Sequence, residues 1–103
     1  MDKYYLKIHS SNSKTIVAVC DAELLGKEFR EGNLVLRIDE PFYGGKLVDI
    51  DEVVQAISSA DIVVVTGARL VEELSKRGIV PSSFALKVQG QPHIQIVKEV
   101  ERY

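Results

Sequence analysis

The stretch DIDEVVQAISSADIVVVTGARLVEELSKR, residues 49–77, decides how this chain folds. Its first part, residues 49–60, begins with acidic side chains, which stabilise the positive end of a helix dipole. Four apolar residues then recur at helical spacing and form one stripe: Ile50, Val53, Val54 and Ile57. This part therefore predicts an amphipathic helix.

The second part of the stretch changes period. Residues 61–66 (DIVVVT) are apolar on both alternating faces, which is typical of a central strand covered on both sides, or by a helix on one side and a loop on the other. Gly67 ends this strand, and residues 68–77 predict a second amphipathic helix that Gly78 closes. The middle of the chain thus reads helix, strand, helix.

The flanking sequence is dominated by alternating apolar residues, which indicate half-buried strands. We expect such strands over residues 4–9, 14–20, 33–38, 84–88 and 93–100. Asp21 is predicted to cap a short helical turn that Gly26 ends. Phe42 and Tyr43 sit in a break before Gly44-Gly45 and are expected to pack back onto the domain.

These elements predict a single domain over residues 1–103, because 103 residues with 46% hydrophobic content suffice for one core. The fold class is α+β: a two-layer sandwich with a mostly antiparallel sheet and the two helices on one face. All the strands are expected to form a single sheet.

Composition excludes several classes of function. Thirteen Lys and Arg face fifteen Asp and Glu, so a strongly basic nucleic-acid binder is disfavoured, although a local basic strip is not. The lone Cys20 permits neither an internal disulfide nor a cysteine-rich zinc site, and we expect no metal and no cofactor. The N-terminus lacks the apolar region of a signal peptide, and apolar runs such as 62–65 are too short to span a membrane. We therefore expect a soluble, cytoplasmic protein.

Several segments occur together in a recognisable order. They are AVCDAELLGKEFREG, PFYGGKLVDIDEV, the Gly67 turn after an apolar strand, and GQPHIQIV. Together they resemble an archaeal family of roughly hundred-residue proteins, the "domain of unknown function 424" family. The resemblance implies an archaeal cytoplasmic protein with a compact two-layer α/β fold, and it implies no established reaction.

The junction Thr66-Gly67-Ala68-Arg69 is the first candidate site. A helix N-terminus offers free amides, Gly67 lets a ligand approach the backbone, and Arg69 can grip a phosphate. A single glycine at such a junction is more often only a turn. His93 is a candidate base or ligand at the start of the last strand, where histidine more often caps a carbonyl or lies in solvent.

Cys20, Asp21 and the face of the first strand are further candidates. Cys20 precedes a helical turn that can activate a thiol, yet it is in register with buried residues and is more simply a small hydrophobe, with Asp21 as a cap. One face of the first strand alternates cations with rings, and Tyr43 can extend it. This predicted RNA face consists of Lys3, Tyr5, Lys7, His9 and Tyr43.

Three functions compete. The first is a non-catalytic binding module in RNA metabolism or translation, with RNA or the ribosome as partner. The second is a small enzyme or a nucleotide or phosphate binder, which requires Gly67, Arg69 and His93 to converge in one pocket. The third is a protein-interaction subunit, for which an open sheet edge or an exposed apolar patch is the expected sign.

Overall fold

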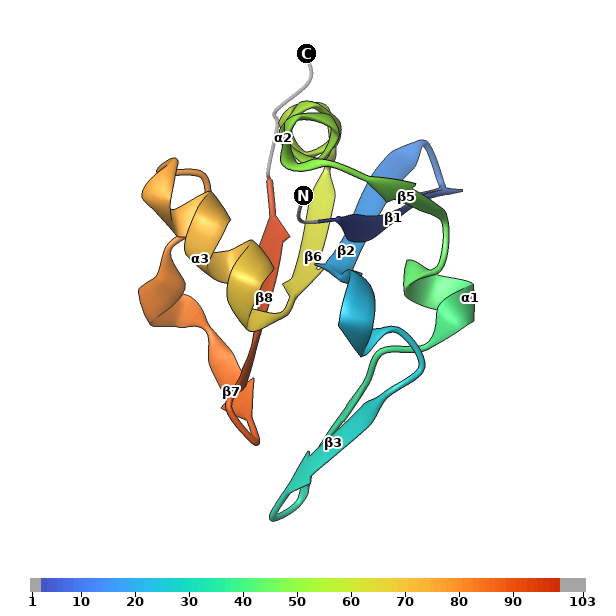
Figure 1. Cartoon of the computed structure of the whole chain (residues 1–103). Coiled ribbons are helices and arrows are strands. Elements are labelled where there is room, and N and C mark those ends of the chain that lie inside the picture. Colours follow the sequence, from blue (N-terminus) through green and yellow to red (C-terminus); the bar gives the residue numbers. More distant parts are fainter. Residues whose placement is uncertain (1–2, 99–103) are drawn as a thin grey trace.

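The computed structural model describes residues 3–98, which form a six-stranded sheet, a separate two-stranded hairpin and three α-helices. The sheet has the strand order β5-β1-β2-β6-β8-β7, which Figure 1 displays from one edge to the other. Its strands are β1 (Tyr4–Ser11), β2 (Lys14–Asp21), β5 (Lys46–Val48), β6 (Ile62–Thr66), β7 (Leu86–Val88) and β8 (Gln91–Val97). Neighbours are antiparallel except β2 and β6, which run parallel.

One face of the sheet, called the helical face below, is covered by α2 (Ile50–Ser58) and α3 (Ala68–Lys76). The Asp49 side chain accepts a hydrogen bond from the Glu52 amide and so caps α2, as the acidic start of this segment predicts. Val53, Leu70 and Leu74 are fully buried between the helices and the sheet. Burying one such side chain stabilises the fold by about 1.5–3 kcal/mol.

The opposite face, called the hairpin face, is covered in part by three short elements. These are the 3-10 turn η1 (Ala22–Leu24), α1 (Glu40–Tyr43), and the hairpin of β3 (Glu28–Glu31) with β4 (Leu34–Arg37). One row of paired residues crosses all six strands on this face: Leu47, Tyr5, Cys20, Thr66, His93 and Leu86. Residues two apart along each strand share a face, so this row tells which residues of every strand point toward the hairpin.

The predicted fold class is confirmed: the protein is α+β, the sheet is mostly antiparallel, and α2 and α3 lie on one face. Strand β6 lies at the centre and is buried on both sides, as predicted for residues 61–66. Within residues 3–98, no helix is long and apolar enough to cross a membrane.

Two strand predictions were correct only in part. The strand predicted over residues 33–38 exists as β4, but it does not join the main sheet; it pairs with β3, which the sequence did not predict, in a hairpin that projects from the sheet (Figure 1). Phe84 does not point inward, because residues 82–84 form the 3-10 turn η2 and its ring is 78% exposed. Leu86 is also exposed, whereas Val88 is buried as expected.

Candidate functional site

The junction after β6 holds an internal carboxylate. Both oxygens of Asp21, at the end of β2, accept hydrogen bonds from the first amides of α3: Oδ2 from Arg69 at 3.1 Å and Oδ1 from Leu70 at 2.9 Å. These are the amides that the sequence offered to a phosphate. The Asp21 side chain makes no capping bond to the η1 turn, so the predicted local cap is wrong, and Asp21 instead caps a helix 48 residues away.

Gly67 is required at this junction by both conformation and space. Its φ of +124° lies in a region that L side chains rarely adopt, and a Cβ atom there would lie 2.4 Å from Asp21 Cγ. The approach that Gly67 allows is therefore the approach of Asp21, from the neighbouring parallel strand.

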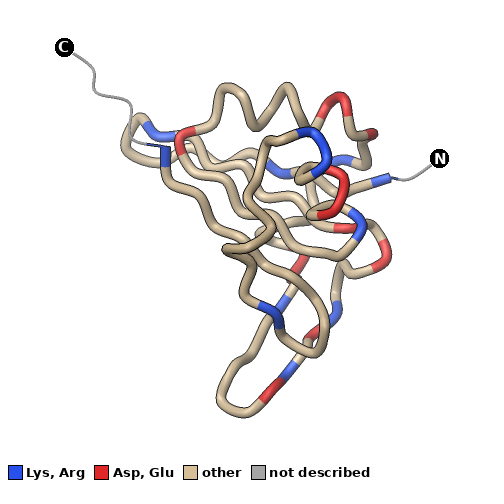
Figure 2. The backbone as a smooth tube through the Cα atoms, turned by 90° about the vertical axis from the view of Figure 1, so that its left-hand side faces the viewer, with Lys and Arg blue, Asp and Glu red and all other residues tan. Residues whose placement is uncertain are grey.

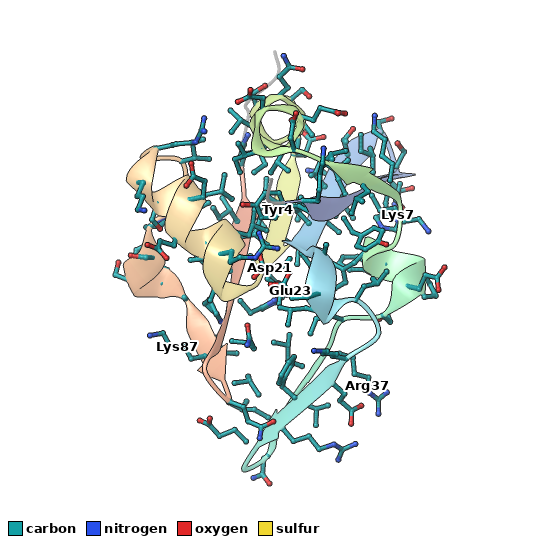
Figure 3. All side chains as sticks on the ribbon, in the orientation of Figure 1. Tyr4, Lys7, Asp21, Glu23, Arg37 and Lys87 are labelled. Atoms are coloured by element: carbon teal, nitrogen blue, oxygen red, sulfur yellow. The ribbon has the colours of Figure 1, made fainter. Side chains whose placement is uncertain are left out.

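Arg69 is held by neighbours from η1 and from the start of β1. Its Nε donates to Glu23 Oε2 at 2.9 Å, its Nη2 donates to the Lys3 carbonyl at 3.1 Å, and its guanidinium lies 5.1 Å above the Tyr4 ring. The bond to Arg69 lowers the pKa of Glu23 to about 2. Figure 3 shows Tyr4, Asp21 and Glu23 close together at the centre of the molecule. The guanidinium thus ties η1 and β1 to α3.

Burial governs the acid–base character of Cys20 and Asp21. Burial, assisted by the adjacent Asp21 charge, raises the pKa of the Cys20 thiol to about 12, so this fully buried side chain stays a thiol. Burial also raises the pKa of Asp21 above its ordinary value, although the two amide hydrogen bonds act in the opposite direction. Cys20 is therefore a small core residue, as its strand register indicated.

A second set of polar residues forms a hydrogen-bonded line on the hairpin face. The buried Thr66 Oγ1 lies 2.9 Å from the Tyr43 hydroxyl and 2.8 Å from His93 Nδ1, and His93 Nε2 lies 3.1 Å from Gln95 Nε2. Burial lowers the pKa of His93, so its ring is neutral at pH 7. Burial raises the pKa of the Tyr43 hydroxyl. The line joins α1, β6 and β8 through side chains that serve as one another's hydrogen-bond partners.

Residues of the predicted pocket do not point to one place. Thr66, Gly67 and His93 are neighbours at the end of β6, where Gly67 N donates to the Pro92 carbonyl. Arg69, however, stacks on Tyr4 on the helical face, whereas His93 points to the hairpin face. The convergence that an enzyme using Gly67, Arg69 and His93 requires is absent from this arrangement.

The predicted RNA face is only partly open. Tyr43 is buried with its hydroxyl on Thr66, so it cannot stack a base. His9 stacks on Phe42 of α1 at 5.0 Å, and its Nε2 lies 2.8 Å from the Phe42 carbonyl. Tyr5 is half-buried under the same turn of helix. Helix α1 therefore covers part of a strand face that the sequence predicted to be open to solvent.

Lysines on this side remain without acidic partners. Among residues 3–98, six lysines form no ion pair: Lys3, Lys7, Lys14, Lys27, Lys87 and Lys98, and the Lys98 amine donates to the Ile57 carbonyl. By strand alternation Lys3, Lys7 and Lys14 point to the hairpin side of β1 and β2, and Lys27 follows η1, which covers the same side. Figure 2 shows residues of both charge signs spread over the described part of the chain, so the lysines on the hairpin side are a local feature of a protein with mixed charge.

Sequence reasoning missed a groove on the helical side. The groove has a volume of about 570 Å³ and lies between α3 and the segment from η2 to the β7–β8 turn. Its lining includes Val71, Ala85, Pro92, Ser75, Lys76 and Lys87. No motif marks it, because its walls come from residues of ordinary type that only the tertiary fold brings together. Within the described part of the chain, no cluster of His, Cys, Asp and Glu can hold a metal.

Fold and site together define a small α+β protein whose reactive side chains are mostly engaged with one another. The chain belongs to the family described as "Protein of unknown function (DUF424)", whose model matches residues 8–98. It is also similar to a solved structure, an uncharacterized conserved protein from Methanopyrus kandleri. The two are 27% identical, the match covers 98% of this chain and 96% of that one, and the TM-score is 0.71. No curated protein matches the chain.

Proposed function

We propose that this protein is a non-catalytic binding module that contacts single-stranded RNA, in RNA metabolism or translation. The observation that carries the proposal is the strip of lysines without ion pairs on the hairpin side of β1 and β2. Lys3, Lys7 and Lys14 lie along it, and Lys27 follows η1 on the same side.

Unpaired lysines suit a phosphate backbone for a physical reason. A cation already bound to a carboxylate must give up that partner before it binds a phosphate, whereas an unpaired lysine loses only water. Binding phosphates also releases the ions condensed on the nucleic acid, which favours association at low salt. The half-buried Tyr5 ring lies between Lys3 and Lys7 in the strand and can offer one edge of a stacking surface.

The formal net charge of −2 sets the expected strength of binding. Acidic side chains elsewhere on the surface repel the same phosphates, so a contact through a few lysines is weak and strongly salt-dependent. We therefore expect binding to a short unpaired segment, or to an exposed strand on a ribosomal subunit, and not to a long duplex.

The test is filter binding of the full chain to single-stranded RNA and to ribosomal subunits at several salt concentrations. For single strands the logarithm of affinity falls with the logarithm of salt by about 0.7 per phosphate contact. Lys7→Ala and Lys14→Ala should each lower the slope by about that amount. Lys46→Ala is the control, because Lys46 is exposed on β5 and paired with Glu52.

Two outcomes would count against the proposal. If the wild-type chain binds neither RNA nor ribosomal subunits at any salt concentration, the module does not act on RNA. If it binds with a slope that Lys7→Ala and Lys14→Ala leave unchanged, the strip on β1 and β2 is not the contact.

Source and location are part of the same proposal. The similar protein from Methanopyrus kandleri supports an archaeal source. A lone cysteine that is buried and protonated fits a reducing cytoplasm, because it neither needs nor forms a disulfide within the chain.

A further inference from the structure

The two edges of the sheet differ in what lies beside them. Strand β5 forms one edge, where Lys46 is paired with Glu52 of α2 at 3.0 Å. Strand β7 forms the other edge and borders the 570 Å³ groove under α3. Figure 1 shows β7 at the outer side of the sheet, with α3 above it and the β3–β4 hairpin to its right in this view.

The backbone of β7 has hydrogen-bonding groups that point away from the sheet. Gln89 and Gly90 both have positive φ, at 49° and 80°, and form a two-residue turn that makes Val88 and Gln91 a hydrogen-bonded pair. Hydrogen-bonded and non-bonded pairs alternate in an antiparallel ladder, so Lys87 and Pro92 form a non-bonded pair. Pro92, which has no N–H, fits this position. The Lys87 N–H and C=O therefore face the open edge.

The charged residues that line the groove are two lysines and one glutamate: Lys76, Lys87 and Glu72. The exposed Lys87 has no ion pair, and the amine of Lys76 meets only Glu72, one turn away at 3.3 Å. Exposed pairs at this spacing contribute only about 0.3–0.5 kcal/mol, so Lys76 is free to bind a better-placed anion. The buried Ser75 Oγ in the groove wall has no hydrogen-bond partner within the described residues. An acidic ligand would satisfy all three groups.

Apolar groups complete the surface on both sides of β7. Val71, Ala85 and Pro92 form the apolar part of the groove on the helical side. Leu86 lies half-exposed on the hairpin face of the same strand, and Phe84, two residues earlier, is mostly exposed to solvent. A strand laid against β7 would send alternate side chains to these two sides.

From this geometry we infer that the edge of β7 binds an extended acidic segment of a partner protein, which pairs with Lys87 as a seventh strand of the sheet. Acidic side chains of the segment enter the groove beside Lys76 and Lys87, and the apolar side chains between them cover Leu86. Main-chain hydrogen bonds supply affinity and the two alternating pockets supply selectivity, as in other cases of strand addition. This surface is distinct from the proposed RNA contact: Figure 3 shows Lys7 and Lys87 on opposite sides of the molecule.

The probe for the experiment is a capped synthetic peptide, Glu-Val-Glu-Val-Glu-Val-Glu, titrated into the full-length isotopically labelled chain and followed by amide NMR spectra. We expect shifts centred on β7 and slower hydrogen exchange of the Lys87 amide. The matched peptide with Lys in place of Glu should not bind. The acidic peptide with methylated backbone nitrogens should not bind either, because it cannot pair with the strand edge.

Substitutions separate this inference from the RNA proposal. Lys87→Glu should lower the affinity for the acidic peptide by about tenfold or more, because it places like charges together. The same substitution should leave RNA binding unchanged. Lys14→Ala should weaken RNA binding and leave peptide binding unchanged. Lys46→Glu, on the β5 edge, should leave peptide binding unchanged. The inference is overturned if the acidic peptide does not bind, if Lys87→Glu leaves its affinity unchanged, if backbone methylation has no effect, or if RNA and not peptide shifts the β7 amides.

Discussion

The polar groups at the end of β6 are paired with one another, whereas several polar groups on β1, β2 and β7 are not. At the end of β6, Asp21 binds the first amides of α3, Arg69 binds Glu23, and Thr66 lies between Tyr43 and His93. On β1, β2 and β7, lysine side chains and the outward backbone of β7 have no such partners.

The contrast separates structural chemistry from binding chemistry. Residue types that are common in active sites occur at the end of β6, but they stabilise the fold because each one already has a partner. A group that is to bind a ligand must be able to exchange water for it, and the lysines of β1, β2 and β7 and the outward backbone of β7 are such groups. Substitutions at the end of β6 test this contrast, and we expect the largest effects on stability there.

Gly67→Ala should have the largest effect. The added Cβ would lie 2.4–2.8 Å from the Asp21 carboxyl atoms, at a φ that alanine rarely adopts. Strain and overpacking together should lower the free energy of unfolding by about 3 kcal/mol. Urea unfolding measures it, with Gly32→Ala in the hairpin turn as a control that has positive φ and open space. Equal losses for the two variants would show that backbone strain alone matters, and the Asp21 contact would then have no role.

Asp21→Ala should have the next largest effect, since it leaves the amides of Arg69 and Leu70 without an acceptor. Loss of a helix cap in a buried setting costs about 2 kcal/mol. Asp21→Asn should cost less, because its amide oxygen still accepts one of the two bonds. A chemical-denaturation series on the three proteins measures this order. If Ala and Asn are equivalent, the carboxylate does not act as a double acceptor.

Much of the fold could be predicted because its signals are local. Apolar strand patterns indicate β1 and β2, and a continuous apolar run indicates β6. Apolar residues at helical spacing indicate α2 and α3, and Gly67 and Gly78 flank α3. The β3 strand, EFRE, has one apolar residue in four and pairs outside the sheet, so it carries no such signal. The prediction that Phe84 points inward from a strand was wrong because residues 82–84 form a 3-10 turn after Pro81. The alternation of apolar residues in the sequence does not reveal this turn.

The site was harder to predict because its contacts are distant in sequence. Asp21 and Leu70 are 49 residues apart, and Arg30 and Gln89, whose bond ties the hairpin to the β7–β8 turn, are 59 apart. Sequence reasoning found the free amides of α3 but could not see that parallel pairing of β2 with β6 places a carboxylate on them. Cys20, by contrast, was read correctly as buried because strand register is a local property.

Substitution of His93 should have the smallest effect on stability, and it tests the junction through the pH dependence of the free energy of unfolding. Burial holds its folded pKa below the ordinary value of 6.5, so the folded protein binds this proton less readily than the unfolded chain does. Its contribution to stability is complete above pH 6.5 and is lost as the pH falls from there through the folded pKa. His93→Gln keeps a hydrogen-bonding side chain near Thr66 but does not titrate. The difference in free energy of unfolding between wild type and His93→Gln should therefore shrink on acidification from pH 7; curves that stay parallel would mean that His93 is as solvated as in the unfolded chain.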